Sequence, residues 1–133
     1  MSQEDLEIVR QLLEAFNSED IERVLALTHR DVVVEISPEV SAEPDTYRGH
    51  DGMRRYFQSF RDAMDEIRFE SEQVVDVGPS VVVALRLTAS GRQTAIRVQQ
   101  RSAGVWTTAE GKLIRIRSYA SADDALKAVG LAE

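Results

Sequence analysis

The second half of the sequence most limits what this chain can fold into. Four runs rich in β-branched and other apolar residues lie at 67–77, 81–89, 94–108 and 112–120. Turn-forming pairs separate them: Gly78-Pro79, Ser90-Gly91 and Glu110-Gly111. Short turns of this kind join antiparallel neighbours, so the runs predict a meander. Alternation within the second run places four side chains on the face that packs inward: Val81, Val83, Leu85 and Leu87.

The first half of the sequence is predominantly helical in pattern. Apolar residues recur at helical spacing over residues 3–16, and residues 17–20 supply capping chemistry for a second helix. A third helix is predicted from residue 53 to about residue 65. Its apolar stripe is interpreted as core and consists of Met53, Phe57, Phe60 and Met64.

Shorter elements complete the pattern. Residues 31–36 are too short and too β-branched for a helix, so they predict a strand that Pro38 ends. A polar loop rich in proline and glycine follows and is expected to cover part of the fold. Ser121 caps a short closing helix. Helices followed by a long meander predict one α+β domain over residues 1–133, in which a curved, mixed or antiparallel sheet packs around the N-terminal helices.

Composition excludes several classes of protein. The chain has no cysteine, which rules out thiolate catalysis, cysteine-bound zinc, iron–sulfur clusters and disulfides and favours the cytoplasm. The N-terminus lacks a signal-peptide pattern, and no apolar run has the length of a membrane span. The net charge of −7 repels phosphate backbones and anionic lipid, so we expect neither nucleic acid nor a membrane as partner.

Motifs for cofactors and for hydrolytic serines are missing. No glycine cluster follows a strand and opens a helix, so the sequence implies no nucleotide cofactor. A nucleophile-elbow motif is absent as well. The two histidines, His29 and His50, have no further ligand at metal-site spacing, and we predict no metal.

Three stretches resemble a known family: Tyr47-Arg-Gly-His50 before the third helix, the hairpin residues 106–112 (WTTAEGK), and residues 124–131 (DALKAVGL) near the end. Together with the order of elements, they resemble the SnoaL-like branch of the NTF2-like superfamily, which includes polyketide cyclases and ketosteroid isomerases. The resemblance implies a cone-shaped fold with an apolar pocket at its open end. It also implies pairing of two copies through the outer face of the sheet.

The resemblance argues against an isomerase mechanism. Aligned on Asn17, Asp31 and Gly111-Lys112, the isomerase tyrosine, base and oxyanion-binding acid fall at three groups that neither donate nor accept protons: Leu12, Ile36 and Ala103. A register shift of one residue on the first strand would instead bring Glu35 into the pocket. The apolar face of Val32, Val34 and Ile36 favours the opposite, with Asp31 at the turn and Glu35 outside.

Polar candidates for the pocket come mainly from residues 94–108. Counting by twos from Val105 and Ala103 predicts that Arg101 and Gln99 face the concave side. Arg101 would then stabilise a carboxylate, an enolate or a phosphate. The alternative is a bulge near Gln99 that turns Arg101 into solvent.

Further candidates lie on other elements. His50 is a candidate general base, whereas His29 is interpreted as a residue at a helix end. Tyr47 and Ser118 are expected to offer hydrogen bonds in the pocket. The predicted apolar lining consists of Leu12, Phe16, Ile36, Phe57, Val83, Ala103 and Ile116.

Two classes of function remain open. One is a cofactor-independent cyclase, isomerase or hydrolase that acts on a small apolar carbonyl compound, and the other is a non-catalytic module that binds a small hydrophobic or acidic ligand. A pocket filled by side chains is a third possibility. A homodimer is predicted through outward-facing apolar side chains of the sheet, namely Val82, Ala84, Val98 and Trp106.

Overall fold

The structure, a computed structural model, describes residues 2–36, 46–91, 94 and 96–130. Within these residues the helices are α1 (Ser2–Asn17), α2 (Ile21–Ala26), α3 (Gly49–Ala63) and α4 (Ala122–Ala128). The strands are β1 (Thr28–Glu35), β2 (Thr46–Arg48), β3 (Met64–Asp76), β4 (Ser80–Gly91), β5 (Arg97–Ala109) and β6 (Lys112–Tyr119). Residues 37–45, most of the predicted covering loop, lie outside the described residues.

The strands form one mixed sheet in the order β2-β1-β6-β5-β4-β3. The predicted meander is confirmed, because β3 to β6 are antiparallel neighbours in chain order. β1 pairs in parallel with β6 and antiparallel with β2. The sequence did not predict β2, because three residues are too short for a periodic pattern. The α+β fold expected from the sequence is confirmed.

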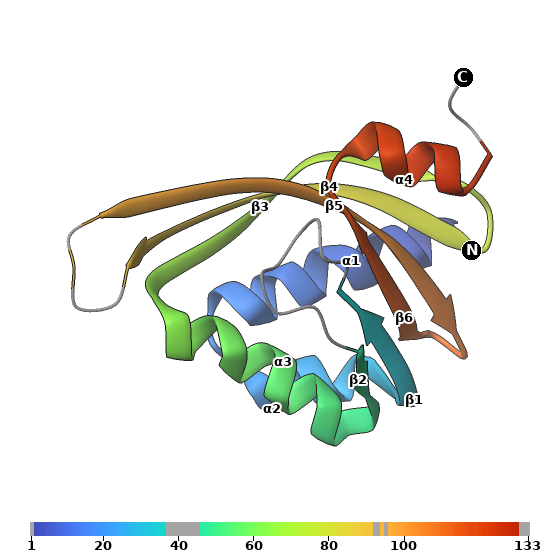
Figure 1. The fold of residues 1–133 in the computed structure, drawn as a ribbon. Helices are drawn as coiled ribbons and strands as arrows, with labels where there is room; N and C mark the ends of the chain where they lie inside the picture. Colours follow the sequence, from blue (N-terminus) through green and yellow to red (C-terminus); the bar gives the residue numbers. More distant parts are fainter. Residues whose placement is uncertain (1, 37–45, 92–93, 95, 131–133) are drawn as a thin grey trace.

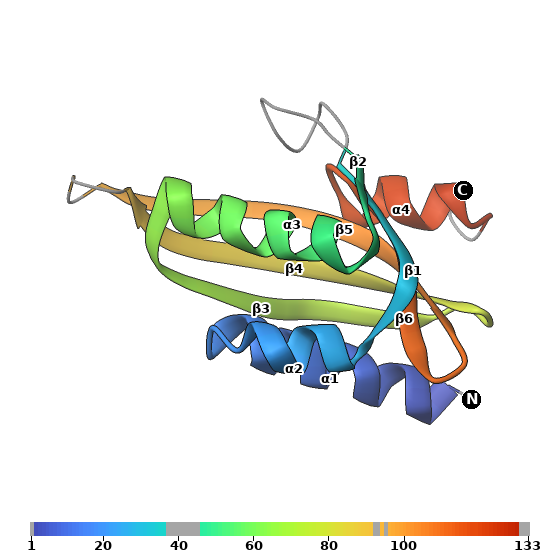
Figure 2. The ribbon, with the colours of Figure 1, turned by 90° about the horizontal axis from the view of Figure 1, so that it is seen from below.

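Helices cover both faces of this curved sheet (Figure 1). α1 and α3 pack on its concave face, where α3 lies lengthwise along the long strands (Figure 2). The larger core lies there, and its fully buried members include Leu12, Val24, Val34 and Met53. α4 lies on the opposite face and closes a smaller core of Val82, Ala103, Val105 and Ala125.

The caps expected from the sequence are present. The Asp20 carboxylate accepts a hydrogen bond from the backbone N–H of Arg23 at 3.1 Å and begins α2. The Ser121 hydroxyl accepts one from the backbone N–H of Asp124 at 3.1 Å and begins α4. Of the described helices, none is both long and apolar enough to cross a membrane.

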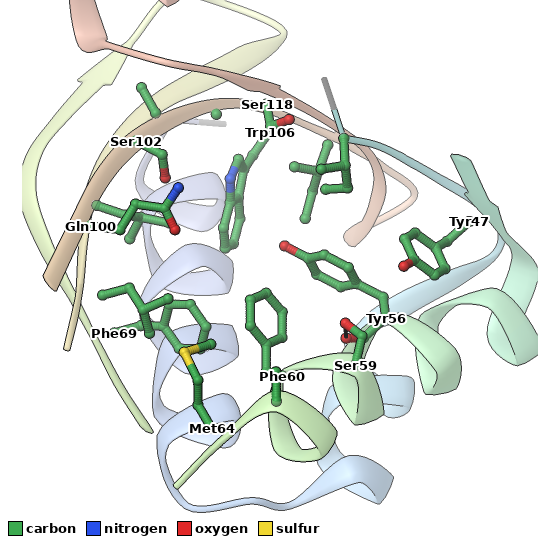
Figure 3. A pocket seen from close by; sticks show the side chains of 17 residues that line it. Tyr47, Tyr56, Ser59, Phe60, Met64, Phe69, Gln100, Ser102, Trp106 and Ser118 are labelled. Atoms are coloured by element: carbon green, nitrogen blue, oxygen red, sulfur yellow. Dashed lines mark hydrogen bonds between the residues drawn. The ribbon is translucent and has the colours of Figure 1, made fainter. Parts of the chain in front are cut away.

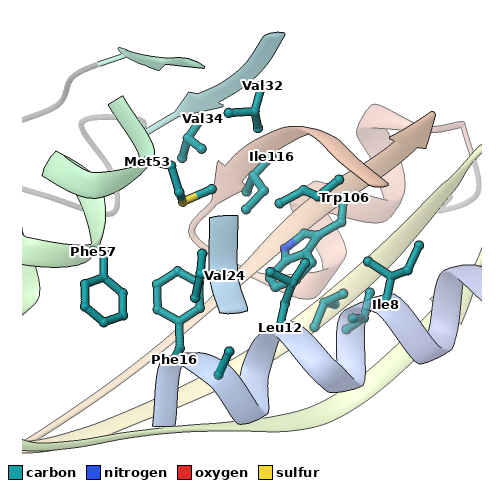
Figure 4. Close-up of a cluster of buried hydrophobic side chains, with 14 of the residues drawn as sticks. Ile8, Leu12, Phe16, Val24, Val32, Val34, Met53, Phe57, Trp106 and Ile116 are labelled. Atoms are coloured by element: carbon teal, nitrogen blue, oxygen red, sulfur yellow. The ribbon is translucent and has the colours of Figure 1, made fainter. Parts of the chain in front are cut away.

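Trp106 points into the larger core, against the prediction that it lies on the outer face. It is 4% exposed and packs near Leu12 of α1 (Figure 4). Val98 lies opposite Ala89 and therefore shares the concave phase of β5 with Trp106. Val82 is on the outer face but is buried under α4. Of the four residues predicted to form the dimer surface, only Ala84 lies on the part of the outer face that α4 leaves uncovered. The prediction that the other three residues lie on this surface is therefore wrong.

The free edge of β3 is tied to the end of α1 by Asn17. The Asn17 amide N–H donates to the backbone oxygen of Phe69 at 2.9 Å, and the backbone N–H of Phe69 donates to the Asn17 amide oxygen at 2.7 Å. The side chain thus replaces one residue of a missing neighbouring strand. Satisfied edge groups resist pairing with other chains.

Asn17→Ala is expected to lower the free energy of unfolding by about 1–3 kcal/mol, because two part-buried backbone groups of Phe69 lose their partner. Gln11→Ala on the same helix is the control, since Gln11 bonds only to the exposed Glu7 and should change stability by less than about 0.5 kcal/mol. Urea denaturation of both variants measures the difference. Equal effects would mean that the Asn17 contacts add nothing.

Candidate functional site

A cavity of about 480 Å³ lies between α3 and the concave face of the sheet (Figure 3). Apolar side chains form most of its wall: Ile36, Phe60, Met64, Phe69, Leu85, Leu87 and Ile116. Polar side chains at the wall are Tyr47, Tyr56, Ser59, Gln100, Ser102 and Ser118, together with the indole of Trp106. The side chains of the described residues leave this space open, which argues against the third possibility raised by the sequence.

α3 supplies one wall of the cavity. Tyr56 and Phe60 are four residues apart and therefore lie along one face of α3, and Met64, the first residue of β3, continues this wall. The Tyr56 ring is held by neighbouring rings, with centroids 5.0 Å from Phe60 and 5.4 Å from Tyr47. The sequence prediction assigned Phe60 and Met64 to the core and missed Tyr56. The four-residue spacing of large side chains was the available signal.

The Tyr56 hydroxyl points into the cavity (Figure 3). It makes no hydrogen bond within the described residues. Burial, with a smaller contribution from Tyr47, raises the pKa of Tyr56 well above its usual range. The phenol therefore stays neutral at physiological pH and remains a hydrogen-bond donor.

The raised pKa of Tyr56 predicts a loss of stability at alkaline pH. The folded protein keeps the Tyr56 proton where the unfolded chain releases it, so this contribution is complete below about pH 10 and falls as the pH rises further. Urea denaturation between about pH 8 and about pH 11 should show a shallower decline for Tyr56→Phe than for the original chain. Identical slopes would contradict the burial of this hydroxyl.

β5 supplies the opposite wall, in the phase opposite to the one predicted. Residues directly opposed in an antiparallel pair share a face, and Gly104, Ser102 and Gln100 oppose Val83, Leu85 and Leu87. Arg101 and Gln99 consequently lie on the outer face. The pairing with β4 runs without a register shift, so no bulge causes this orientation. Val105 and Ala103 are apolar because α4 covers them from outside.

Arg97 and Arg101, on the outer face, form ion pairs with carboxylates of β3. The Arg101 Nε donates to Glu72 at 3.0 Å, and the Arg101 side chain is 62% exposed. Arg97 lies 3.4 Å from the carboxylate of Glu66, donates to the Ser90 hydroxyl at 2.9 Å and is equally exposed. The prediction that Arg101 and Gln99 reach the cavity is therefore wrong, and neither residue can contact a ligand there.

His50 does not line the cavity. Its Nε2 lies 2.9 Å from the backbone oxygen of Thr28 and, since a carbonyl only accepts, donates to it at the start of α3. This bond fixes α3 against β1 and gives no support to a role as general base. Glu35 faces away from the cavity, as expected, and pairs with Arg115.

Tyr47 and Ser118 line the cavity where the sequence placed them. The guanidinium of Arg55 lies 5.0 Å from the centroid of the Tyr47 ring. The Ser118 hydroxyl donates to the backbone oxygen of Glu35 at 3.0 Å. Their contact with a ligand stays a prediction.

The predicted apolar lining divides into two groups. Ile36 and Ile116 line the cavity, and Ala103 borders it while its side chain packs beneath α4. The other four lie in the core behind the cavity wall: Leu12, Phe16, Phe57 and Val83. Sequence periodicity identifies the inward face of an element but does not separate core from cavity.

The wall of this cavity carries no charged side chain from the described part of the chain. Groups of carboxylate or histidine ligands suited to a metal ion are likewise missing from the described residues. Apart from hydroxyls, an amide and an indole, the cavity is apolar. It can accept an uncharged molecule and donate hydrogen bonds to its oxygen atoms.

Comparison with known families gives a match over residues 9–116 to the SnoaL-like domain. The match includes α3, β5 and most of the other elements that line the cavity. A search among curated proteins gave no significant match.

Solved structures match over nearly the whole chain. An NTF2-like protein of unknown function from Burkholderia pseudomallei has 19% identity and a TM-score of 0.78, with 96% of this chain and 98% of that chain covered. TerC, co-crystallized with polyporic acid, has 19% identity, a TM-score of 0.75 and coverage of 95% and 98%. A Mycobacterium tuberculosis protein in complex with estradiol-17beta-hemisuccinate has 16% identity, a TM-score of 0.74 and coverage of 87% and 92%. At these low identities, the structural likeness shows a shared fold alone.

Proposed function

The chain belongs to the SnoaL-like family, and from this premise we propose that it binds an uncharged, largely apolar small molecule that carries a carbonyl or hydroxyl oxygen. The observation that carries the proposal is the cavity itself, which combines apolar walls with the unpartnered hydroxyl of Tyr56. An oxygen acceptor beside Tyr56 would satisfy this donor. The small molecules present in two structures of the same fold support a binding role.

The uncharged wall favours a neutral ligand over an acidic one. A carboxylate that entered this cavity would lose its hydration, and the described residues offer no cation to replace it. Arg101, the cation expected there, binds Glu72 on the outer face. We therefore prefer the hydrophobic ligand of the two that the sequence left open.

Binding without catalysis fits the wall of this cavity best. Proton transfer in an isomerase or cyclase needs a base as well as an acid, and none of the described residues at the cavity is a carboxylate or a histidine. Tyr56 alone favours the second candidate, a cofactor-independent enzyme, because a neutral phenol stabilises an enolate. Exchange of the α-protons of a bound ketone in deuterated water, lost in Tyr56→Phe, would support this enzyme.

Calorimetric titration with two probes of equal shape tests the binding proposal. The neutral ketone 2-acetylnaphthalene should bind at least about tenfold more tightly than the anion 2-naphthoate. Tyr56→Phe should weaken ketone binding by about tenfold, because it removes one hydrogen bond. Tyr119→Phe is the matched control, since Tyr119 lies on the outer face beside Arg117. Tighter binding of the anion, or equal effects of the two variants, would contradict the proposal.

Two expectations from the sequence are kept as proposals: a cytoplasmic location, and pairing of two copies through the uncovered part of the outer sheet face. The second now depends on Ala84 and its polar neighbours instead of Val82, Val98 and Trp106. A monomer observed by light scattering at about tens of micromolar protein would contradict the predicted pairing.

A further inference from the structure

Hydrogen-bonding groups follow one another along the β5 wall. Gln100, Ser102, Gly104 and Trp106 alternate with outward-facing residues, so all four face the cavity. Neighbours in such a row are about 6.6 Å apart along the strand. Gly104 interrupts the row, because it has no side chain to contribute.

The Trp106 indole fills the gap at Gly104. A Cβ atom built at Gly104 would lie 2.7 Å from the Trp106 Nε1 and 3.0 Å from its Cδ1. The N–H edge of the indole therefore lies over Gly104, next in the row to Ser102. Two donors thus stand side by side on this wall.

Both of these donors are free for a ligand. Neither the indole N–H of Trp106 nor the hydroxyl of Ser102 makes a hydrogen bond within the described residues. Both residues line the cavity. Among the described side chains, only Arg86 has an unpartnered nitrogen or oxygen that is fully enclosed, so the Trp106 and Ser102 groups keep access to the open space.

The Tyr56 hydroxyl faces these donors from another element. It comes from α3, which packs on the concave face of the sheet, and Figure 3 shows Tyr56 on the side of the cavity away from Ser102. Apolar side chains, including Phe60, Phe69 and Leu85, line the cavity beside these polar groups. The cavity therefore has donors on two facing walls, and most of the remaining lining is apolar.

We propose that the ligand carries two oxygen functions on opposite edges of a flat apolar body, one accepting from Tyr56 and the other bonding to Trp106 and Ser102. This inference rests on the proposed binding function and names the ligand class within it. An apolar compound with one oxygen would leave the donors of one wall without a partner in the complex, at the cost of a lost hydrogen bond. Uncharged hydroxyaryl ketones fit this description.

Two matched probes test the second oxygen. 6-Acetyl-2-naphthol has oxygens at both ends, whereas 2-acetylnaphthalene has only the ketone. The original chain should bind the hydroxyketone about tenfold more tightly in calorimetric titrations, the effect of one hydrogen bond. Ser102→Ala and, as a second variant, Trp106→Phe should each reduce this ratio toward one, whereas Gln99→Ala on the outer face should preserve it.

The possible outcomes separate this inference from the proposed function. Binding of both probes with equal affinity overturns the two-oxygen ligand and leaves the binding function intact. A ratio that Ser102→Ala and Trp106→Phe both leave unchanged also overturns it, because the second oxygen would then bond elsewhere. Binding of 2-acetylnaphthalene alone likewise overturns the two-oxygen ligand, whereas failure of both probes to bind overturns the proposed function itself.

Discussion

Trp106→Ala is expected to lower the free energy of unfolding by about 3–5 kcal/mol. The indole is 4% exposed and joins the core formed by α1, β1 and β4. Its removal leaves a hole that rigid neighbours such as Leu12 and Val81 cannot close. Urea denaturation at neutral pH measures the change.

Arg101→Ala is the matched control for Trp106→Ala on the same strand. Arg101 lies on the outer face, where its ion pair with Glu72 is largely solvated, so its loss should cost less than about 1 kcal/mol. The contrast tests the orientation of β5. If the arginine were inside and the tryptophan outside, the order of the two effects would be reversed.

Gly104→Val is expected to weaken ligand binding by at least about tenfold. The first carbon of the new side chain would collide with the Trp106 indole at 2.7 Å, so the ring must turn into the cavity and occupy ligand space. Overpacking of this kind also costs about 1–3 kcal/mol of stability. Titration with 2-acetylnaphthalene and urea denaturation measure the two effects.

A double-mutant cycle provides the control for the Gly104 substitution. In a Trp106→Leu background the ring that collides is gone, so Gly104→Val should cost clearly less stability than in the original chain. Additive effects would show that Gly104 is needed for some reason other than its contact with Trp106.

The sequence predicts the elements well because their signals are local. Helical spacing defines α1, alternation defines the inward face of β4, and the positive φ angles of Glu110 and Gly111 match the predicted turn between β5 and β6. The site is predicted less well. Tyr47 and Ser118 reach the cavity as expected, whereas Arg101 and Gln99 do not.

The failure on β5 has a physical cause. Val105 and Ala103 are apolar, and so is Trp106, so both faces of this strand carry core-like residues and alternation alone cannot choose between them. The position of α4 on the outer face decides the matter, and that depends on tertiary packing. The pairing of β4 with β5 gives the correct orientation, because Gly104 and Ser102 lie opposite Val83 and Leu85, which the sequence already assigns to the inward face.

The central claim, that an uncharged ligand binds in the cavity between α3 and β5, is tested most directly by an NMR titration. The chain has one tryptophan, so its indole N–H gives a single signal in a ¹⁵N-labelled sample. Addition of 2-acetylnaphthalene should shift this signal together with the backbone amides of Ser102 and Ser118. Shifts confined to outer-face residues such as Arg101 and Glu72, with the indole signal unmoved, would contradict the claim.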